Sequence, residues 1–256
     1  MLFVVAFINR EAEFCKDFVI KINHHQQSEF ITNTEVDEII NAKGNLKGQR
    51  IKQINISILE SAIKKNAWVK NAELYFENNG ILHVDIEQKE PIARLFTVNG
   101  LSYYLNNLGE RLPVKQNATS RVLVITNFPS DNLKLSTTDS ILLNEATRLA
   151  NFINVDSFWN AQIAQINITN TGKFEFTPTI GNQLIVFGDS SNLKEKFDKL
   201  YSYYKSVWLQ NGLNTYDTLD IRFEHQIVAK MKNKIIVQND TLSNSLLIED
   251  SLKQKP

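Results

Sequence analysis

Residues 72–86 read Ala-Glu-Leu-Tyr-Phe-Glu-Asn-Asn-Gly-Ile-Leu-His-Val-Asp-Ile, and this stretch decides the fold of the first part of the chain. Apolar and polar residues alternate on both sides of the turn residues Asn78-Asn79-Gly80. Such alternation is typical of a strand with one buried face, and Asn-Gly between two strands is a strong hairpin signal. The sequence therefore predicts a β-hairpin here.

The residues before the hairpin predict one strand and two helices. Residues 14–23 alternate in the same way and predict a strand. Thr34-Glu35-Val36-Asp37 predicts the start of a helix that runs to Gly44, and Ser57-Ile58-Leu59-Glu60 is a capping box that predicts a second helix. The predicted order over residues 14–91 is therefore β-α-α-β-β.

After Pro91 the sequence predicts many strands and two helices. Helical spacing of apolar residues follows a predicted cap at Ser136 and recurs over residues 192–210. The expected strands cover residues 93–98, 102–105, 121–126, 163–169, 173–177, 183–187, 219–223 and 226–231. We expect an α+β protein, with one domain at 14–91, a mostly antiparallel β domain with two helices at 92–231, and a mobile C-terminal tail at 232–256.

Residues 1–8, Met-Leu-Phe-Val-Val-Ala-Phe-Ile, are wholly apolar. A membrane-spanning helix needs about 20 apolar residues, and a secretory signal peptide needs a basic start and a small-residue cleavage site. Two interpretations stay open from these residues alone. The segment is a short buried N-terminal element, or residues 1–13 are the end of a transmembrane helix and the segment that follows it.

The charge balance excludes a polycationic function. The chain has 28 basic and 28 acidic residues, and neither half is a polycation, which argues against binding nucleic acid or an anionic membrane surface. Its four histidines lack the i, i+4 spacing of a metalloprotease, and Cys15 has no second cysteine beside which to bind zinc. The phosphate-binding and nucleophile-elbow motifs are also absent from the sequence.

The sequence thus predicts no catalytic residues, no cofactor site and no metal site. A protein with clear strand signals and no catalytic residues is better interpreted as a binding or scaffold protein. Such proteins often dock partners on an exposed strand edge, because its free N–H and C=O groups can pair with a partner strand.

Several motifs then carry a resemblance to one family. They are Ala67-Trp68-Val69, the stretch from Gly80 to Ala93 that ends in Glu90-Pro91-Ile92-Ala93, Tyr103-Tyr104-Leu105-Asn106, Phe158-Trp159 and Leu219-Asp220-Ile221-Arg222-Phe223. In this order the chain resembles the FtsQ/DivIB cell-division family over nearly all of residues 14–231. It departs from the family pattern at Ala67, Asn106 and Phe223, which replace Pro, Asp and Tyr.

The resemblance implies a POTRA domain at 14–91, since the family carries this β-α-α-β-β unit. It also implies a single-pass inner-membrane protein whose bulk lies in the periplasm at the septum. The implied function is non-enzymatic: a divisome scaffold that binds FtsB-like and FtsL-like proteins and links early division components to septal peptidoglycan synthesis. By position, the implied partner site comprises Asp220, Arg222, Phe223, Glu224, Gln226, Val228 and Lys230.

Alternatives remain at this point. Arg222 could be an ordinary outward-facing strand charge. The whole chain could be a POTRA-type chaperone or scaffold of outer-membrane protein assembly or secretion, although such proteins usually carry repeated POTRA units. A cell-wall enzyme would need a nucleophile, a zinc set or paired perturbed carboxylates, which the sequence does not supply.

Overall fold

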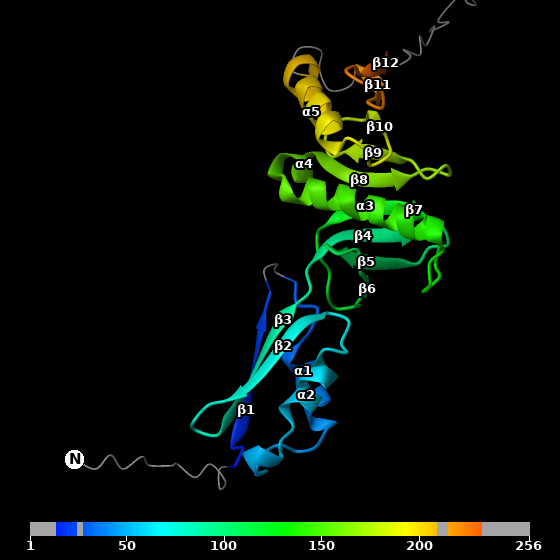
Figure 1. Cartoon of the computed structure of the whole chain (residues 1–256). Helices are drawn as coiled ribbons and strands as arrows, with labels where there is room; N and C mark the ends of the chain where they lie inside the picture. The colour runs from blue at the N-terminus through cyan, green and yellow to red at the C-terminus, as the bar shows by residue number, and fades with distance from the viewer. Residues whose placement is uncertain (1–13, 25–27, 209–214, 232–256) are drawn as a thin grey trace, which may run out of the picture.

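The computed structural model describes residues 14–24, 28–208 and 215–231, and these form two units stacked end to end (Figure 1). The first unit holds a three-stranded sheet and the second a nine-stranded sheet. The predicted N-terminal segment 1–13 and the predicted tail 232–256 lie outside the described residues. The predicted boundary between the domains at residues 91 and 92 stays a prediction.

The three-stranded unit has the predicted β-α-α-β-β order. Its elements are β1 (Asp17–Asn23), α1 (Asn33–Asn41), a short 3-10 turn (Ile51–Gln53), α2 (Ile56–Ile63), β2 (Val69–Phe76) and β3 (Ile81–Gln88). The strands lie in the order β1-β3-β2, with β1 parallel and β2 antiparallel to β3. Alternate residues of β2 and β3 are buried and alternate residues of β1 are partly buried, because one face of the sheet packs against the two helices.

The hairpin that the sequence predicted joins β2 and β3. Gly80 has a φ of 82°, and a Cβ at this position would lie 2.7 Å from the carbonyl oxygen of Phe14. Only glycine fits this turn, because it tolerates both the left-handed backbone and the close approach.

The nine-stranded unit follows after the two residues Lys89 and Glu90. Its strands are β4 (Pro91–Thr97), β5 (Ser102–Asn106), β6 (Arg111–Pro113), β7 (Leu123–Phe128), β8 (Ile163–Ile168), β9 (Phe174–Pro178), β10 (Leu184–Gly188), β11 (Tyr216–Asp220) and β12 (Val228–Met231). They lie in the order β12-β11-β10-β9-β8-β7-β4-β5-β6. The helices are α3 (Thr137–Val155), α4 (Ser157–Gln162) and α5 (Leu193–Tyr203), and a π turn (Tyr204–Trp208) continues α5.

The predicted fold class is confirmed. Five of the eight described strand pairings in this sheet are antiparallel and three are parallel. Both predicted helices, α3 and α5, pack into one core with buried residues of the sheet, such as Ile125 and Phe187. The short helix α4 is an addition that the sequence analysis did not predict as a helix.

The helix caps differ from the predicted ones. Thr32, not Thr34, caps α1: its hydroxyl accepts from the N–H of Glu35 at 3.3 Å, and the Glu35 carboxylate accepts from the N–H of Thr32 at 2.9 Å. Asn55, not Ser57, caps α2 and accepts from the N–H of Ile58 at 3.2 Å. Glu60 was predicted to complete the second capping box, but its carboxylate accepts from the N–H of Leu74 on β2 instead, at 3.0 Å.

The last two predicted strands were placed too close together. Residues 219–223 were predicted as one strand, whereas β11 is Tyr216–Asp220; the strand predicted at 226–231 is shorter, at Val228–Met231. The predicted helix over residues 192–210 gives way to the π turn after Tyr203. Residues 221–227 therefore form a connection between two strands.

Candidate functional site

Strand β12 lies at one edge of the nine-stranded sheet, and among the described residues it pairs only with β11 (Figure 1). All four of its residues are exposed. One side of an edge strand keeps its N–H and C=O groups unpaired, which makes it a template for a further strand. This edge is the first part of the candidate site.

The register with β11 decides which way each β12 side chain faces. Ala229 lies opposite Leu219, which is fully buried in the core beneath the helices. Val228 lies opposite Asp220, and Lys230 lies opposite Thr218. Because residues alternate across a strand, Ala229 faces the α5 side of the sheet, whereas Val228 and Lys230 face the other side.

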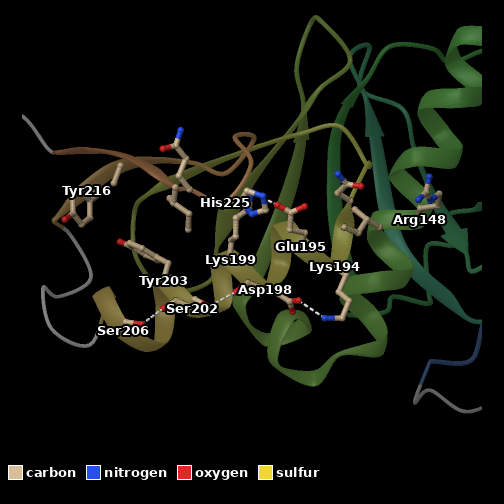
Figure 2. A pocket seen from close by; sticks show the side chains of 15 residues that line it. Arg148, Lys194, Glu195, Asp198, Lys199, Ser202, Tyr203, Ser206, Tyr216 and His225 are labelled. Atoms are coloured by element: carbon tan, nitrogen blue, oxygen red, sulfur yellow. Dashed lines mark hydrogen bonds and ion pairs between the residues drawn. The ribbon is translucent and has the colours of Figure 1, made fainter.

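A groove of about 1240 Å³ lies between α5 and the segment that leads into β12 (Figure 2). Its apolar lining comes from Leu193, Tyr203, Tyr216, Ile227 and Ala229. The groove runs beside the free edge, so a strand added to β12 would direct every second side chain into it. Edge and groove together form what we call the docking surface.

Charged residues of α5 line the groove as internal pairs. Lys194 bonds Asp198 at 2.6 Å, and Lys199 lies 3.6 Å from Glu195 (Figure 2). Lys199 also donates to the carbonyl oxygens of Ile221, at 3.2 Å, and Phe223. This lysine therefore ties α5 to the connection between β11 and β12.

The start of that connection is held by a fork between Arg222 and Asp220. The guanidinium donates to the two carboxylate oxygens at 2.9 and 2.6 Å, and the backbone N–H of Arg222 donates to the same carboxylate at 3.1 Å. The hydrogen bonds from Arg222 lower the pKa of Asp220. A Cβ on Gly188 would lie 2.9 Å from the Arg222 side chain, so glycine at the end of β10 leaves room for the fork.

The structure distributes the seven predicted site residues over three places. Asp220 ends β11, Val228 and Lys230 lie on β12, and four residues lie in the connection: Arg222, Phe223, Glu224 and Gln226. Gln226 alone among them lines the groove. Arg222 is half-exposed but already engaged with Asp220, and Phe223 exposes 44% of its surface beside the Arg222 guanidinium.

Sequence reasoning missed the residues that line the groove. Ile227 and Ala229 alternate with Val228 and Lys230, so the alternation was visible, but only the pairing with β11 says which set faces α5. The helical spacing of Tyr201, Tyr203 and Tyr204 predicts that all three pack in the core; this is wrong for Tyr201, which is 47% exposed. Tyr203 and Tyr204 fit the prediction. Both are buried, and burial raises the pKa of Tyr204 to about 12.

No group of metal-ligating side chains occurs within residues 14–24, 28–208 and 215–231. The other groups that the sequence raised have ordinary surroundings. His83 stacks on Tyr75 and lies 3.2 Å from Glu77 on the solvent face of the three-stranded sheet. Cys15 lies just before β1 rather than within a strand, and burial raises its pKa, which keeps the thiol protonated.

Comparison with known proteins agrees with this architecture. A POTRA-like domain model matches residues 13–87, and the model described as FtsQ/DivIB, C-terminal related matches residues 90–230. No curated protein matches the chain. Since the second match alone covers more than half of the 256 residues, the chain belongs to the FtsQ/DivIB family, a family of non-catalytic cell-division scaffolds.

Proposed function

We propose that this protein is a divisome scaffold that binds FtsB-like and FtsL-like proteins by strand addition at β12. It would thereby link early division components to septal peptidoglycan synthesis. The observation that carries the proposal is the exposed β12 edge beside a groove that has both apolar and charged lining residues. In strand addition, main-chain hydrogen bonds supply affinity and pockets for alternate side chains supply specificity. The docking surface offers both.

Residues of β12 and residues that hold the connection before it then have different roles. Val228, Ala229 and Lys230 offer the backbone to a partner strand, while the Asp220–Arg222 fork and Lys199 hold the connection in place. A preformed edge binds more tightly than one that must be ordered on binding. We therefore assign Arg222 a positioning role rather than direct contact with a partner.

The first test uses a matched pair of substitutions on β12. Ala229→Glu places a carboxylate among the apolar residues that line part of the groove, whereas Lys230→Glu places one on the opposite face. With a purified periplasmic segment of an FtsB-like protein from the same organism, calorimetry should show binding weakened about 30-fold by the first change, since burying an unpaired polar group costs about 2 kcal/mol. Lys230→Glu should change binding less than about threefold. Equal effects of both would remove the groove from the proposal.

The second test uses proline on the same strand. Successive N–H groups of an edge strand point alternately to the neighbouring strand and outward. Of Ala229→Pro and Lys230→Pro, one therefore disrupts pairing with β11 and the other removes an outward donor. The variant that keeps the wild-type melting temperature should lose partner binding. Full binding by that variant would contradict strand addition.

We also propose that the protein is anchored in the inner membrane with its bulk in the periplasm. The apolar residues 1–8 and the family membership support this proposal. Residues 1–8 lie outside the part of the chain that the structure describes. Within the described part, no helix is long and apolar enough to cross a membrane. Fractionation of cells that express the gene from its own locus should place the protein with inner-membrane markers; recovery in the cytosol would contradict the proposal.

A further inference from the structure

The two units of the chain share buried residues at the joint between them. Only Lys89 and Glu90 separate β3 from β4. The core of the three-stranded unit includes Tyr104, Leu112 and Ala118, which belong to the nine-stranded unit and its loops. Interfaces between domains are usually polar and permit relative motion unless they are large and hydrophobic. This joint has a continuous apolar interior.

Three aromatic rings form the centre of the joint. Phe30 and Trp68 stack with ring centroids 3.8 Å apart, and Tyr104 of β5 meets Trp68 edge-on at 5.8 Å. All three rings are at most 1% exposed. The indole N–H of Trp68 also donates to the carbonyl oxygen of Pro113 on β6, at 3.1 Å. The rings and this hydrogen bond fix one unit against the other in a single geometry.

A buried glutamine holds the loop that carries Phe30. Gln88, the last residue of β3, is 2% exposed. Its side-chain amide oxygen accepts from the backbone N–H groups of Phe30 at 2.6 Å and Ile31 at 3.2 Å. Its side-chain amide nitrogen donates to the backbone carbonyl oxygen of Ser28 at 3.1 Å. The Ser28 hydroxyl in turn donates to the carbonyl oxygen of Thr119 in the second unit. Loss of this glutamine would leave buried backbone groups unpaired.

Two ion pairs border the aromatic centre. One joins the connection between the units to the second unit, and the other joins the two units directly. Lys89 lies 2.9 Å from Glu110, and Lys115 lies 2.5 Å from Glu35 of α1. Partly exposed pairs contribute little affinity but favour one relative orientation of the surfaces that carry them. The two ion pairs therefore favour the same relative orientation of the units as the buried contacts do.

We infer that the loop Ser28–Ile31 and Gln88 form an interdomain latch, which joins the two units into one rigid body that unfolds cooperatively. The latch lies at the opposite end of the nine-stranded sheet from β12, because β5 and β6 end the sheet on this side. It therefore holds the β12 edge at a constant orientation relative to the first unit. This inference concerns how the docking surface is presented and holds whether or not β12 binds a partner.

The test measures the distance between the units in solution. Spin labels are attached at Ser57→Cys on α2 and Asn144→Cys on α3, both exposed positions, in a Cys15→Ser background. The wild-type latch should give one narrow distance distribution. Gln88→Ala and Tyr104→Ala should broaden it at least about twofold, since the units then move as separately linked domains. The control Ile63→Ala changes a buried residue of α2 that takes part in none of the ring contacts, hydrogen bonds and ion pairs named above, and it should leave the width unchanged.

Calorimetry of the same proteins supplies the second readout. The wild type and Ile63→Ala should each unfold in a single transition. Gln88→Ala and Tyr104→Ala should each show two transitions. A wild-type distribution as broad as that of the variants, or variants that remain narrow and unfold in one step, would overturn the latch. If Tyr104→Ala does not fold, Gln88→Ala decides alone. Partner binding at β12 is a separate measurement, so its loss with an intact latch counts only against the docking proposal.

Discussion

Two lysines of α5, each paired with an aspartate, show how burial changes the contribution of the same residue types. Lys196 is 8% exposed, lies 3.0 Å from a carboxylate oxygen of Asp189 and 5.0 Å from the centre of the Phe187 ring. Its ammonium also donates to the carbonyl oxygen of Asp189 at 2.8 Å. Lys194, two residues earlier on the helix, is 85% exposed and bonds Asp198 at 2.6 Å. Lys196 is therefore shielded from solvent, whereas Lys194 is not.

Substituting each lysine by methionine should separate the two cases. Lys196→Met should lower the free energy of unfolding by about 2 kcal/mol, because it removes charge-assisted hydrogen bonds from a largely buried site. Lys194→Met should change it by less than about 0.5 kcal/mol, as expected of an exposed pair. Urea unfolding of both variants gives the comparison, and similar losses would contradict the argument from burial.

The pH dependence of the Lys196 effect follows from its partner. The Ser191 hydroxyl and Lys196 lower the pKa of Asp189 below its ordinary value of 3.8. A lowered folded pKa means that the pair stabilises the fold fully above that ordinary value and less as the pH falls toward the lowered one. The difference between wild type and Lys196→Met should therefore shrink in acid.

At the scale of single elements, α1 shows why a capping motif needs its partner residue. Thr32 and Thr34 both precede apolar residues at helical spacing, and both are exposed. Only Thr32 has glutamate three residues later, which allows two reciprocal hydrogen bonds. Asp37, which stands in that place relative to Thr34, accepts instead from the side chain of Asn41 at 3.0 Å.

The two threonines provide a direct test of the cap. Thr32→Ala should lower the free energy of unfolding by about 1 kcal/mol, as the loss of an N-cap does elsewhere. Thr34→Ala, on the surface of the first turn, should change it by less than about 0.5 kcal/mol. Chemical denaturation measures both. A larger loss at Thr34 would mean that α1 starts later in solution.

At the scale of the whole molecule, the joint between the units sets the behaviour in acid. The hydrogen bond from Lys89 lowers the pKa of Glu110 below its ordinary value of 4.5, and the side-chain amide of Asn106 adds a second donor at 2.6 Å. Since the folded pKa is lowered, the stabilisation is present above pH 4.5 and is lost as the pH falls through the folded value. The ion pair at the border therefore weakens in acid while the aromatic centre remains.

Replacing Glu110 by glutamine isolates that contribution. The melting temperature of the wild type should fall more steeply between pH 5 and pH 3 than that of Glu110→Gln, because glutamine does not titrate. The two proteins should differ most at neutral pH and converge in acid. Scanning calorimetry over this range makes the measurement. Parallel curves would show that Glu110 does not contribute to the pH dependence.

The sequence by itself determined the order and type of most elements. Alternation at residues 72–86 and helical spacing in α3 are local properties, and both were predicted correctly because side-chain direction follows directly from backbone geometry. The cap positions of α1 and α2 and the ends of β11 were predicted wrongly, since several neighbouring residues could serve and packing chose among them.

Only the tertiary structure decided what lies together. That Ala229 faces the groove and Lys230 does not depends on the register with β11, and a shift of one residue would exchange them. That Trp68 packs on Phe30 and Tyr104, and that Gln88 holds the loop beside them, depends on contacts between distant parts of the chain. The periodicity of apolar residues predicts which side chains are buried. It does not predict which other residues they pack against, because that depends on how separate elements pack together.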